Sequence, residues 1–308
     1  MSAASAVSAA VEVIGGIALA PLLPGLVQHW KARLQGRRGP TPSQPYRELR
    51  RLWSKSMVDP EGAGAVYRLA PLVVAAALVG GILLVPVTAT APNLGLGRDA
   101  LVLLGLLELA HFAITSAAWD VSNGFSLMGA SRDLMLSVFV EATFVLSLAV
   151  VALIAGTTDL RGIVAGTAGA GVWGSPALAL GAVAFAFVVV AETGRQPVDN
   201  PDTHLELTMI HEGPLLEYAG RDLAYLQGAA AARHWLVLVL AAQVFLPHPT
   251  DVWLQLAVLP VALVVLCAAL AIVETLVAKM RILLVPRLIA VGAAAALLGI
   301  AAWIVGSL

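Results

Sequence analysis

Long apolar stretches constrain this chain more than any other feature. Hydrophobic residues make up 59% of its 308 residues and charged residues 12%, and the mean hydropathy is +0.89. A helix needs about 20 apolar residues to cross the roughly 30 Å hydrocarbon core of a bilayer. Eight stretches of about this length are present, at 7–30, 66–91, 99–118, 133–156, 173–192, 229–247, 252–278 and 284–306. The sequence therefore predicts an all-α integral membrane protein in which residues 1–308 form one membrane domain.

Basic residues predict the orientation of these helices, because cytoplasmic loops are rich in Lys and Arg. With the N-terminus outside, alternating loops leave only Arg98 and Arg161 of the 18 basic residues outside. No basic residue precedes the first apolar stretch, which reaches spanning length, so we expect it to be retained rather than cleaved as a signal peptide. We expect a multi-pass protein of the cell (inner) membrane. The net charge of −1 gives no indication of a nucleic-acid partner.

Cysteine usage limits the redox chemistry of the chain. Its one cysteine, Cys267, lies inside a predicted helix, so neither an iron–sulfur cluster nor a zinc–thiolate site can be built from thiolates of this chain. We expect the chain to bind no cofactor or metal of its own. Any redox metal is expected in a partner subunit.

A basic segment at 31–65 follows the first predicted helix. It begins with a hook rich in Arg, Gly and Pro, and continues into a stretch in which Tyr46, Leu49, Trp53 and Met57 recur at helical spacing between basic residues. This pattern is typical of an amphipathic helix in the plane of the membrane interface. The helix could serve equally as an anchor to anionic lipid or as a docking surface for another subunit.

A long polar segment at 193–228 separates two apolar stretches and is predicted to be cytoplasmic. It has three prolines and a predicted short helix at 204–212, and long loops with such punctuation are usually functional rather than simple solvated connections. Its acids are Asp199, Asp202, Glu206, Glu212, Glu217 and Asp222. We expect the chemistry of the chain to lie here.

Carboxylates inside the apolar stretches need a reason, because a charge at the bilayer centre costs about 2.5–3.5 kcal/mol on insertion scales. Glu108 and His111 are three residues apart and share one helix face. Glu141 lies within another predicted helix, and Glu192 closes the fifth. We expect Glu108 and Glu141 to handle protons, with a neutral structural hydrogen bond as the alternative. Glu12 and Glu274 are interpreted as reaching the interface.

The sequence context argues against a dinucleotide-binding enzyme and against a zinc hydrolase. Residues 169–174 match G-x-G-x-x-G, but no strand precedes them, so a dinucleotide site is not predicted. The histidines of the polar segment do not form H-E-x-x-H, which argues against a zinc hydrolase.

Several motifs resemble one family in order along the chain. Residues 191–199, A-E-T-G-R-Q-P-V-D, resemble the A-E-T-N-R-x-P-F-D signature of subunit 1 of respiratory complex I. Further similarity covers 36–40, 129–132 with Glu141, 206–207 and 217–218. The chain departs from that subunit at His204, where the family has Glu, and in the longer stretch between Leu207 and Glu217. Residues 44–50 and 203–212 instead resemble the homologous membrane subunit of formate hydrogenlyase and related membrane-bound nickel–iron hydrogenases.

The resemblance implies a membrane-anchoring, proton-coupling subunit with no catalytic centre of its own. It implies large and small hydrogenase subunits, with a nickel–iron centre and iron–sulfur clusters, on the cytoplasmic face, and antiporter-like subunits beside it in the bilayer. It also implies coupling roles for Glu141, Glu192, Asp199, Glu206 and Glu217. Our reading of the residues adds Glu108, Asp202 and Glu212, and expects charge-pairing or docking by Arg37, Arg38, Arg132, Arg195 and Arg221, with Arg195 holding one carboxylate charged.

Other functions remain open from the sequence. The chain could form the quinone chamber of a complex I-like oxidoreductase, or it could be a purely structural membrane anchor whose acids satisfy buried partners. A standalone proton or sodium carrier is a further alternative.

Overall fold

The computed structural model describes residues 12–88, 98–168, 172–200, 209–249 and 251–307, and in these ranges all named elements are helical. The α-helices are α2 (Leu22–Leu34), α3 (Gln44–Trp53), α4 (Ala65–Leu84), α5 (Ala100–Val121), α6 (Gly124–Ala155), α7 (Leu160–Thr167), α8 (Pro176–Glu192), α9 (Gly220–Phe245), α10 (Val252–Leu276) and α11 (Val285–Ser307). Two 3-10 turns, η1 (Gly213–Leu215) and η2 (Ile282–Leu284), precede α9 and α11.

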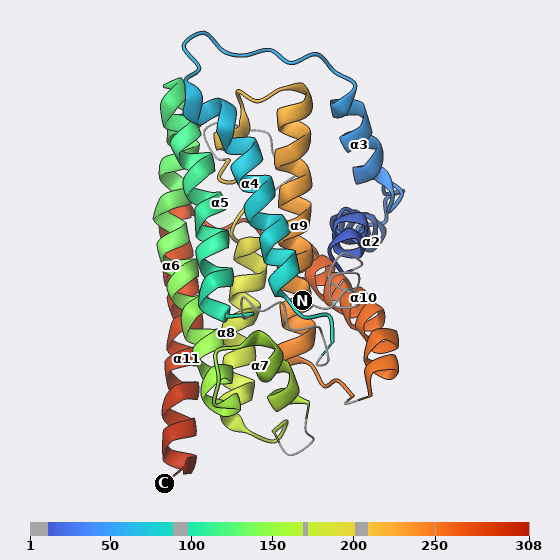
Figure 1. Cartoon of the computed structure of the whole chain (residues 1–308), viewed down its shortest axis with the longest axis vertical. Coiled ribbons are helices and arrows are strands. Elements are labelled where there is room, and N and C mark those ends of the chain that lie inside the picture. Colours follow the sequence, from blue (N-terminus) through green and yellow to red (C-terminus); the bar gives the residue numbers. More distant parts are fainter. Residues whose placement is uncertain (1–11, 89–97, 169–171, 201–208, 250, 308) are drawn as a thin grey trace, which may run out of the picture.

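The prediction of an all-α membrane protein is confirmed. Seven described segments are long and apolar enough to cross a bilayer: Glu12–Leu34, Ala65–Leu84, Ala100–Val121, Gly124–Ala155, Gly220–Phe245, Trp253–Leu276 and Ile282–Gly306. The remaining predicted stretch, at 173–192, forms α8 (Pro176–Glu192), which has only 17 residues. At 1.5 Å per residue α8 is about 26 Å long, shorter than the hydrocarbon core. Figure 1 shows α8 beside only part of the length of α9.

Some predicted boundaries are wrong in an informative way. α6 begins at Gly124 rather than at residue 133, and α9 begins at Gly220 rather than at residue 229, because polar and charged residues continue each helix beyond its apolar part. At 32 residues α6 is about 48 Å long and exceeds the thickness of the hydrocarbon core. α7 was not predicted, since its eight residues carry no pattern longer than two turns.

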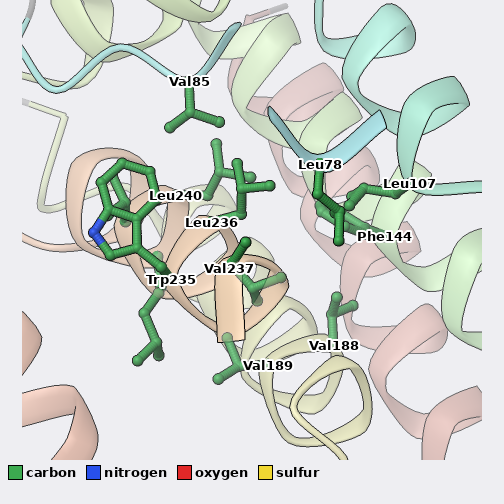
Figure 2. Close-up of a cluster of buried hydrophobic side chains, with 14 of the residues drawn as sticks. Leu78, Val85, Leu107, Phe144, Val188, Val189, Trp235, Leu236, Val237 and Leu240 are labelled. Atoms are coloured by element: carbon green, nitrogen blue, oxygen red, sulfur yellow. The ribbon is translucent and has the colours of Figure 1, made fainter. Parts of the chain in front are cut away.

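α9 is the central helix of the structure. It contacts α2, α3, α4, α7, α8 and α10, and its span is 89% buried, against 22% for the C-terminal span. In Figure 1, α2 and α10 lie on one side of α9, with α4, α5, α6, α8 and α11 on the other. Figure 2 shows residues of α9, including Trp235, Leu236 and Leu240, among side chains such as Leu78 of α4 and Val188 of α8. The polar and charged side chains in the buried part of α9 are therefore shielded from lipid and water.

α3 lies against the upper half of α9 (Figure 1). Leu52 is its buried residue, and Trp53 makes an edge-to-face contact with Tyr225 at 5.1 Å between ring centroids. The predicted helix is confirmed, but Tyr46 and Trp53 of the expected apolar face are exposed and Met57 lies beyond the helix end. The buried face is rotated because α3 packs on a neighbouring helix.

A sharp turn joins α5 to α6. Ser122 adopts a left-handed conformation (φ 57°), and the Asn123 side chain then accepts a hydrogen bond from the Phe125 amide and caps α6. The Asn123 amide nitrogen also donates to the Glu217 carboxylate. One short turn therefore connects two long helices and holds the segment that leads into α9.

The η1 turn packs directly on α6 through two glycines. A Cβ atom added at Gly129 would lie 2.7 Å from Cα of Gly213, and the adjoining Pro214 ring is 3.0 Å away. Only a hydrogen atom fits at this crossing. The contact fixes the position of the polar segment along the axis of α6.

We predict that Gly129→Ala displaces η1 and lowers the free energy of unfolding by about 1–3 kcal/mol, the usual cost of overpacking. Gly124→Ala on the same helix is the matched control, because its added Cβ meets nothing within 4 Å. Thermal unfolding in mild detergent measures both. Equal stability of the two variants would contradict the close packing described here.

Candidate functional site

A cavity lies at the C-terminal end of α8. The cavity has a volume of about 450 Å³ and is bounded by α4, α5, α6, α9 and the segment after α8. Apolar side chains such as Val74, Leu78 and Leu226 form one part of its wall. The titratable or charged groups in its wall are His111, Asp133, Glu192, Asp199, His211, Glu212, Tyr218 and Arg233. The cavity therefore joins an apolar surface to a concentrated set of acids and bases.

Asp199 organises the polar segment at the edge of this cavity. One carboxylate oxygen accepts hydrogen bonds from the backbone amides of Ile210 (3.3 Å) and His211 (3.2 Å) and lies 3.3 Å from His211 Nδ1. The other accepts hydrogen bonds from Lys279 Nζ (2.8 Å) and the Asn200 amide (2.8 Å). The carboxylate thus joins residues 199–200 and 210–211 of the segment to the connection between α10 and α11.

These contacts set the charge of the Asp199–His211 pair. Burial would raise the pKa of Asp199, but the hydrogen bonds and charges of His211 and Lys279 outweigh it and hold that pKa well below its ordinary value. Burial opposes the charged form of His211, yet the hydrogen bond to Asp199 and the negative charges of Asp133 and Asp199 raise the pKa of His211. Near neutral pH the pair is therefore an ion pair.

Glu192 ends α8 beneath the cavity and is 8% exposed. Its Oε2 lies 3.8 Å from Arg233 Nη1 and makes no hydrogen bond in the described part of the chain. The same Arg233 nitrogen is hydrogen-bonded to Nε2 of His111. A second, small cavity of about 20 Å³ lies between His111, Asp133, Glu192 and His211, which is room for one water molecule.

Glu108, His111 and Glu141 come together between α5 and α6. One ligand-type atom of each lies within 4.8 Å of the others. His111 Nδ1 is 3.7 Å from Glu108 Oε1, and Glu141 Oε1 is buried without a hydrogen-bond partner among the described residues. The shared helix face predicted for Glu108 and His111 is confirmed, and the structure adds Glu141 to it.

A second charge cluster lies on the other side of α9. The Glu274 carboxylate of α10 accepts hydrogen bonds from Lys31 of α2 (3.1 Å) and from Arg195 after α8 (3.2 Å), and all three side chains are buried. The interpretation of Glu274 as a residue that reaches the interface is therefore wrong. Arg195 holds a carboxylate, as expected, but this carboxylate comes from α10. Glu12, the other acid interpreted in this way, pairs with buried Arg98 at 2.9 Å.

The remaining predicted residues are distributed differently. Glu212 lines the large cavity, whereas Glu217 accepts its hydrogen bond from Asn123. Arg132 donates to the Met209 carbonyl (3.2 Å), and exposed side chains are those of Arg37, Arg38 and Arg221. Asp202 and Glu206 lie outside the described residues, as do residues 204–208 of the predicted short helix; residues 209–212 of that helix are not helical.

Sequence reasoning missed three contributors to the site. Asp133 was not singled out, and Arg233 was counted only as a basic residue of the cytoplasmic side although it lies inside an apolar stretch. Lys279 was treated in the same way. A buried arginine in a spanning helix requires an acidic partner, so Arg233 could have been paired with one of the intramembrane glutamates, but its hydrogen bond to His111 has no signal in the sequence.

Comparison with known proteins gives a consistent result. The chain matches the NADH dehydrogenase family over residues 7–305. It is 32% identical to hydrogenase-4 component C of Escherichia coli strain K12, over 94% of this chain and 92% of the relative, and 31% identical to formate hydrogenlyase subunit 4 of the same organism, over 90% and 92%. It is 31% identical to a subunit of the NADH-quinone oxidoreductase of Cereibacter sphaeroides, over 77% and 78%.

A solved structure shares the fold. A chain of the membrane-bound sulfane sulfur reductase, an archaeal respiratory membrane complex, superposes with a TM-score of 0.83 at 21% identity, covering 96% of this chain and 99% of that one. At this identity the likeness concerns the arrangement of helices alone.

The Asp199–His211 pair generates a pH prediction. Because the pKa of His211 is raised in the folded protein, its stabilising contribution is complete below the ordinary value of 6.5 and is lost as the pH rises through the raised value. The contribution of Asp199, whose pKa is lowered, is complete above 3.8 and is lost as the pH falls through the lowered value. We expect Asp199→Asn to cost about 1.5–3 kcal/mol between these limits, and less at alkaline pH as the histidine loses its charge.

Thermal unfolding of both proteins across this pH range checks the expectation. Asp159→Asn is the control, since Asp159 is partly exposed and lies 4.0 Å from Arg161 at a distant ion pair. A destabilisation by Asp199→Asn that does not decrease with rising pH would mean that His211 carries no charge in the pair.

Proposed function

The chain belongs to the NADH dehydrogenase family, that of complex I subunit 1, and from this membership we propose that it is the membrane-anchoring, proton-coupling subunit of a multisubunit hydrogenase complex of the formate hydrogenlyase type. Similarity to hydrogenase-4 component C and formate hydrogenlyase subunit 4 extends over nearly the whole chain, whereas that to the NADH-quinone oxidoreductase subunit covers 77% of it. The hydrogenase relatives therefore favour this branch of the family.

The observation that carries the coupling role is the position of Glu192. It lies at the C-terminal end of α8, with the ion-paired Asp199–His211 cluster on the side of the polar segment. Arg233, 3.8 Å away, connects it to His111 and so to the Glu108–Glu141 group. The protonation of the Glu192 carboxylate therefore responds to charge at the Asp199–His211 pair and at the Glu108–His111–Glu141 group.

The coupling mechanism is electrostatic. Two unit charges about 4 Å apart attract or repel by about 4 kcal/mol at an effective dielectric of 20. An electron that arrives near the polar segment changes the field at Asp199, His211 and Glu192, and the protons held by these groups redistribute. Glu141, which lies in the group with Glu108 and His111 that Arg233 connects to Glu192, passes the change into the membrane domain.

The partners follow from this role. Subunits with a nickel–iron centre and iron–sulfur clusters dock against the polar segment on the cytoplasmic face, while antiporter-like subunits and lipid contact the apolar outer faces of the bundle. The chain itself supplies no redox cofactor. Its one cysteine, Cys267, is buried in α10 near the Leu23 carbonyl, which makes it a packing residue.

A second candidate function is supported by the cavity that Glu192 and Asp199 line. Its volume of about 450 Å³ lies in the range of small-molecule sites, and its apolar wall beside polar groups suits a quinone headgroup. Quinone-dependent turnover by the purified complex, lost when Leu226→Trp fills the cavity, would favour this alternative. Turnover that is independent of quinone favours the hydrogenase role.

We predict that Glu141→Gln in the intact complex abolishes hydrogen-linked proton translocation into liposomes but leaves dye-linked hydrogen oxidation unchanged, because the amide keeps the shape of the side chain and cannot take up a proton. Glu48→Gln is the matched control, since Glu48 lies on α3 in a surface ion pair with Arg51.

Normal proton translocation in Glu141→Gln would contradict the proposed role of Glu141 as a proton relay. If Glu141→Gln and Glu192→Gln impair assembly and never coupling alone, the chain is a structural anchor whose acids only satisfy buried partners.

A further inference from the structure

The contact between Arg233 and His111, which the coupling scheme uses only as a connection, is chemically unusual. Arg233 lies on central helix α9 and His111 on α5, and both are more than nine-tenths buried. The guanidinium Nη1 faces the imidazole Nε2 within hydrogen-bond distance. Two basic side chains in such contact need an explanation, because two adjacent positive charges would repel strongly in this environment.

The donor capacity of arginine resolves the question. A guanidinium carries only N–H donors and keeps its charge in proteins. The His111 Nε2 atom that faces it must therefore be the unprotonated, accepting nitrogen. In a neutral imidazole the single proton then lies on Nδ1.

The protonated nitrogen points toward the intramembrane carboxylates. Nδ1 of His111 is 3.7 Å from Glu108 Oε1 and has no closer hydrogen-bond partner among the described residues. Glu141 completes the group from α6. The charged or titratable groups around the ring are Glu108 on its own helix, Asp133 and Glu141 on α6, Glu192 on α8, His211 on the polar segment and Arg233 on α9.

We propose that Arg233 is a positioning residue that holds His111 as a neutral imidazole with its proton on Nδ1, so that the Glu108–His111–Glu141 group is a proton-holding site and not a metal site. Three ligand-type residues within 4.8 Å of one another would otherwise suit a divalent cation. A metal ion at Nδ1 would have to displace the proton while Nε2 still accepts from arginine, which leaves an imidazolate. Arg233 also contributes a positive charge beside the site, which repels a cation.

The experiment is nitrogen NMR of the full chain with ¹⁵N-labelled histidine in lipid bilayers. A His111→Gln variant identifies the His111 signals among those of the six histidines. We expect a protonated-type shift for Nδ1 and an unprotonated-type shift for Nε2 in the unmodified protein. Arg233→Lys, which keeps a charged donor, retains this pattern, whereas Arg233→Gln, whose amide can donate or accept, gives a mixture of the two neutral tautomers.

Internal controls separate this result from general unfolding. His248, whose ring nitrogens lie near the Leu246 and Val164 carbonyls (3.1 and 3.0 Å), lies beyond the C-terminal end of α9 and should keep its shifts. A proton on Nε2, protons on both nitrogens, or a pattern that Arg233→Gln leaves unchanged while His248 is unperturbed would each overturn the proposal. A Mn²⁺ paramagnetic resonance titration adds a direct test, because stoichiometric binding that disappears in His111→Gln would identify a metal site.

The inference rests on the proposed coupling role for its biological meaning, but the two fail separately. The tautomer and the absence of Mn²⁺ binding are properties of this chain and are measured without hydrogen turnover. In the intact complex we further expect Arg233→Gln to lose proton translocation and Arg233→Lys to retain it. Full translocation in Arg233→Gln would overturn the positioning role, whereas normal translocation in Glu141→Gln would overturn the relay itself.

Discussion

Burial of charge in an apolar bundle is the constraint on which the arrangement of this protein depends. An isolated ion in such surroundings costs several kcal/mol even after relaxation, and the structure meets this cost with partners from different helices. Glu274 of α10 joins Lys31 of α2 to Arg195, and Arg233 of central α9 joins Glu192 to His111. Each cluster therefore fixes the position of helices as well as of charges.

At the C-terminal end of α8, several of these buried charged groups line one cavity. The helix ends at Glu192, η1 of the following segment packs on α6 and α5, and the cavity lies between this segment and the bundle. The Gly129–Gly213 contact and the Asn123 cap hold that segment in place without bulky side chains. Asp199 then gathers two backbone amides, His211 and Lys279 at its edge. Redox partners docked there would sense the same carboxylates that reach into the membrane domain.

Much of the fold follows from the length of the apolar stretches, and the shared helix face of Glu108 and His111 follows from their three-residue spacing. What the sequence could not predict are contacts between distant helices: Glu274 with Arg195, and Arg233 with His111, are separated by 79 and 122 residues. Helix ends were misplaced where polar residues extend an apolar helix, as at Gly124 and Gly220. The local sequence pattern there is typical of a loop, but these residues are helical because they pack against neighbouring helices.

The most direct measurement is the metal content of the complex that co-purifies with this chain after extraction in mild detergent through a C-terminal tag. The account predicts nickel in stoichiometric amount together with iron, since the redox centres belong to docked hydrogenase subunits. Iron without nickel in an intact preparation would contradict it and would move the protein to a complex I-like oxidoreductase. An intact preparation with neither metal would contradict the redox role altogether.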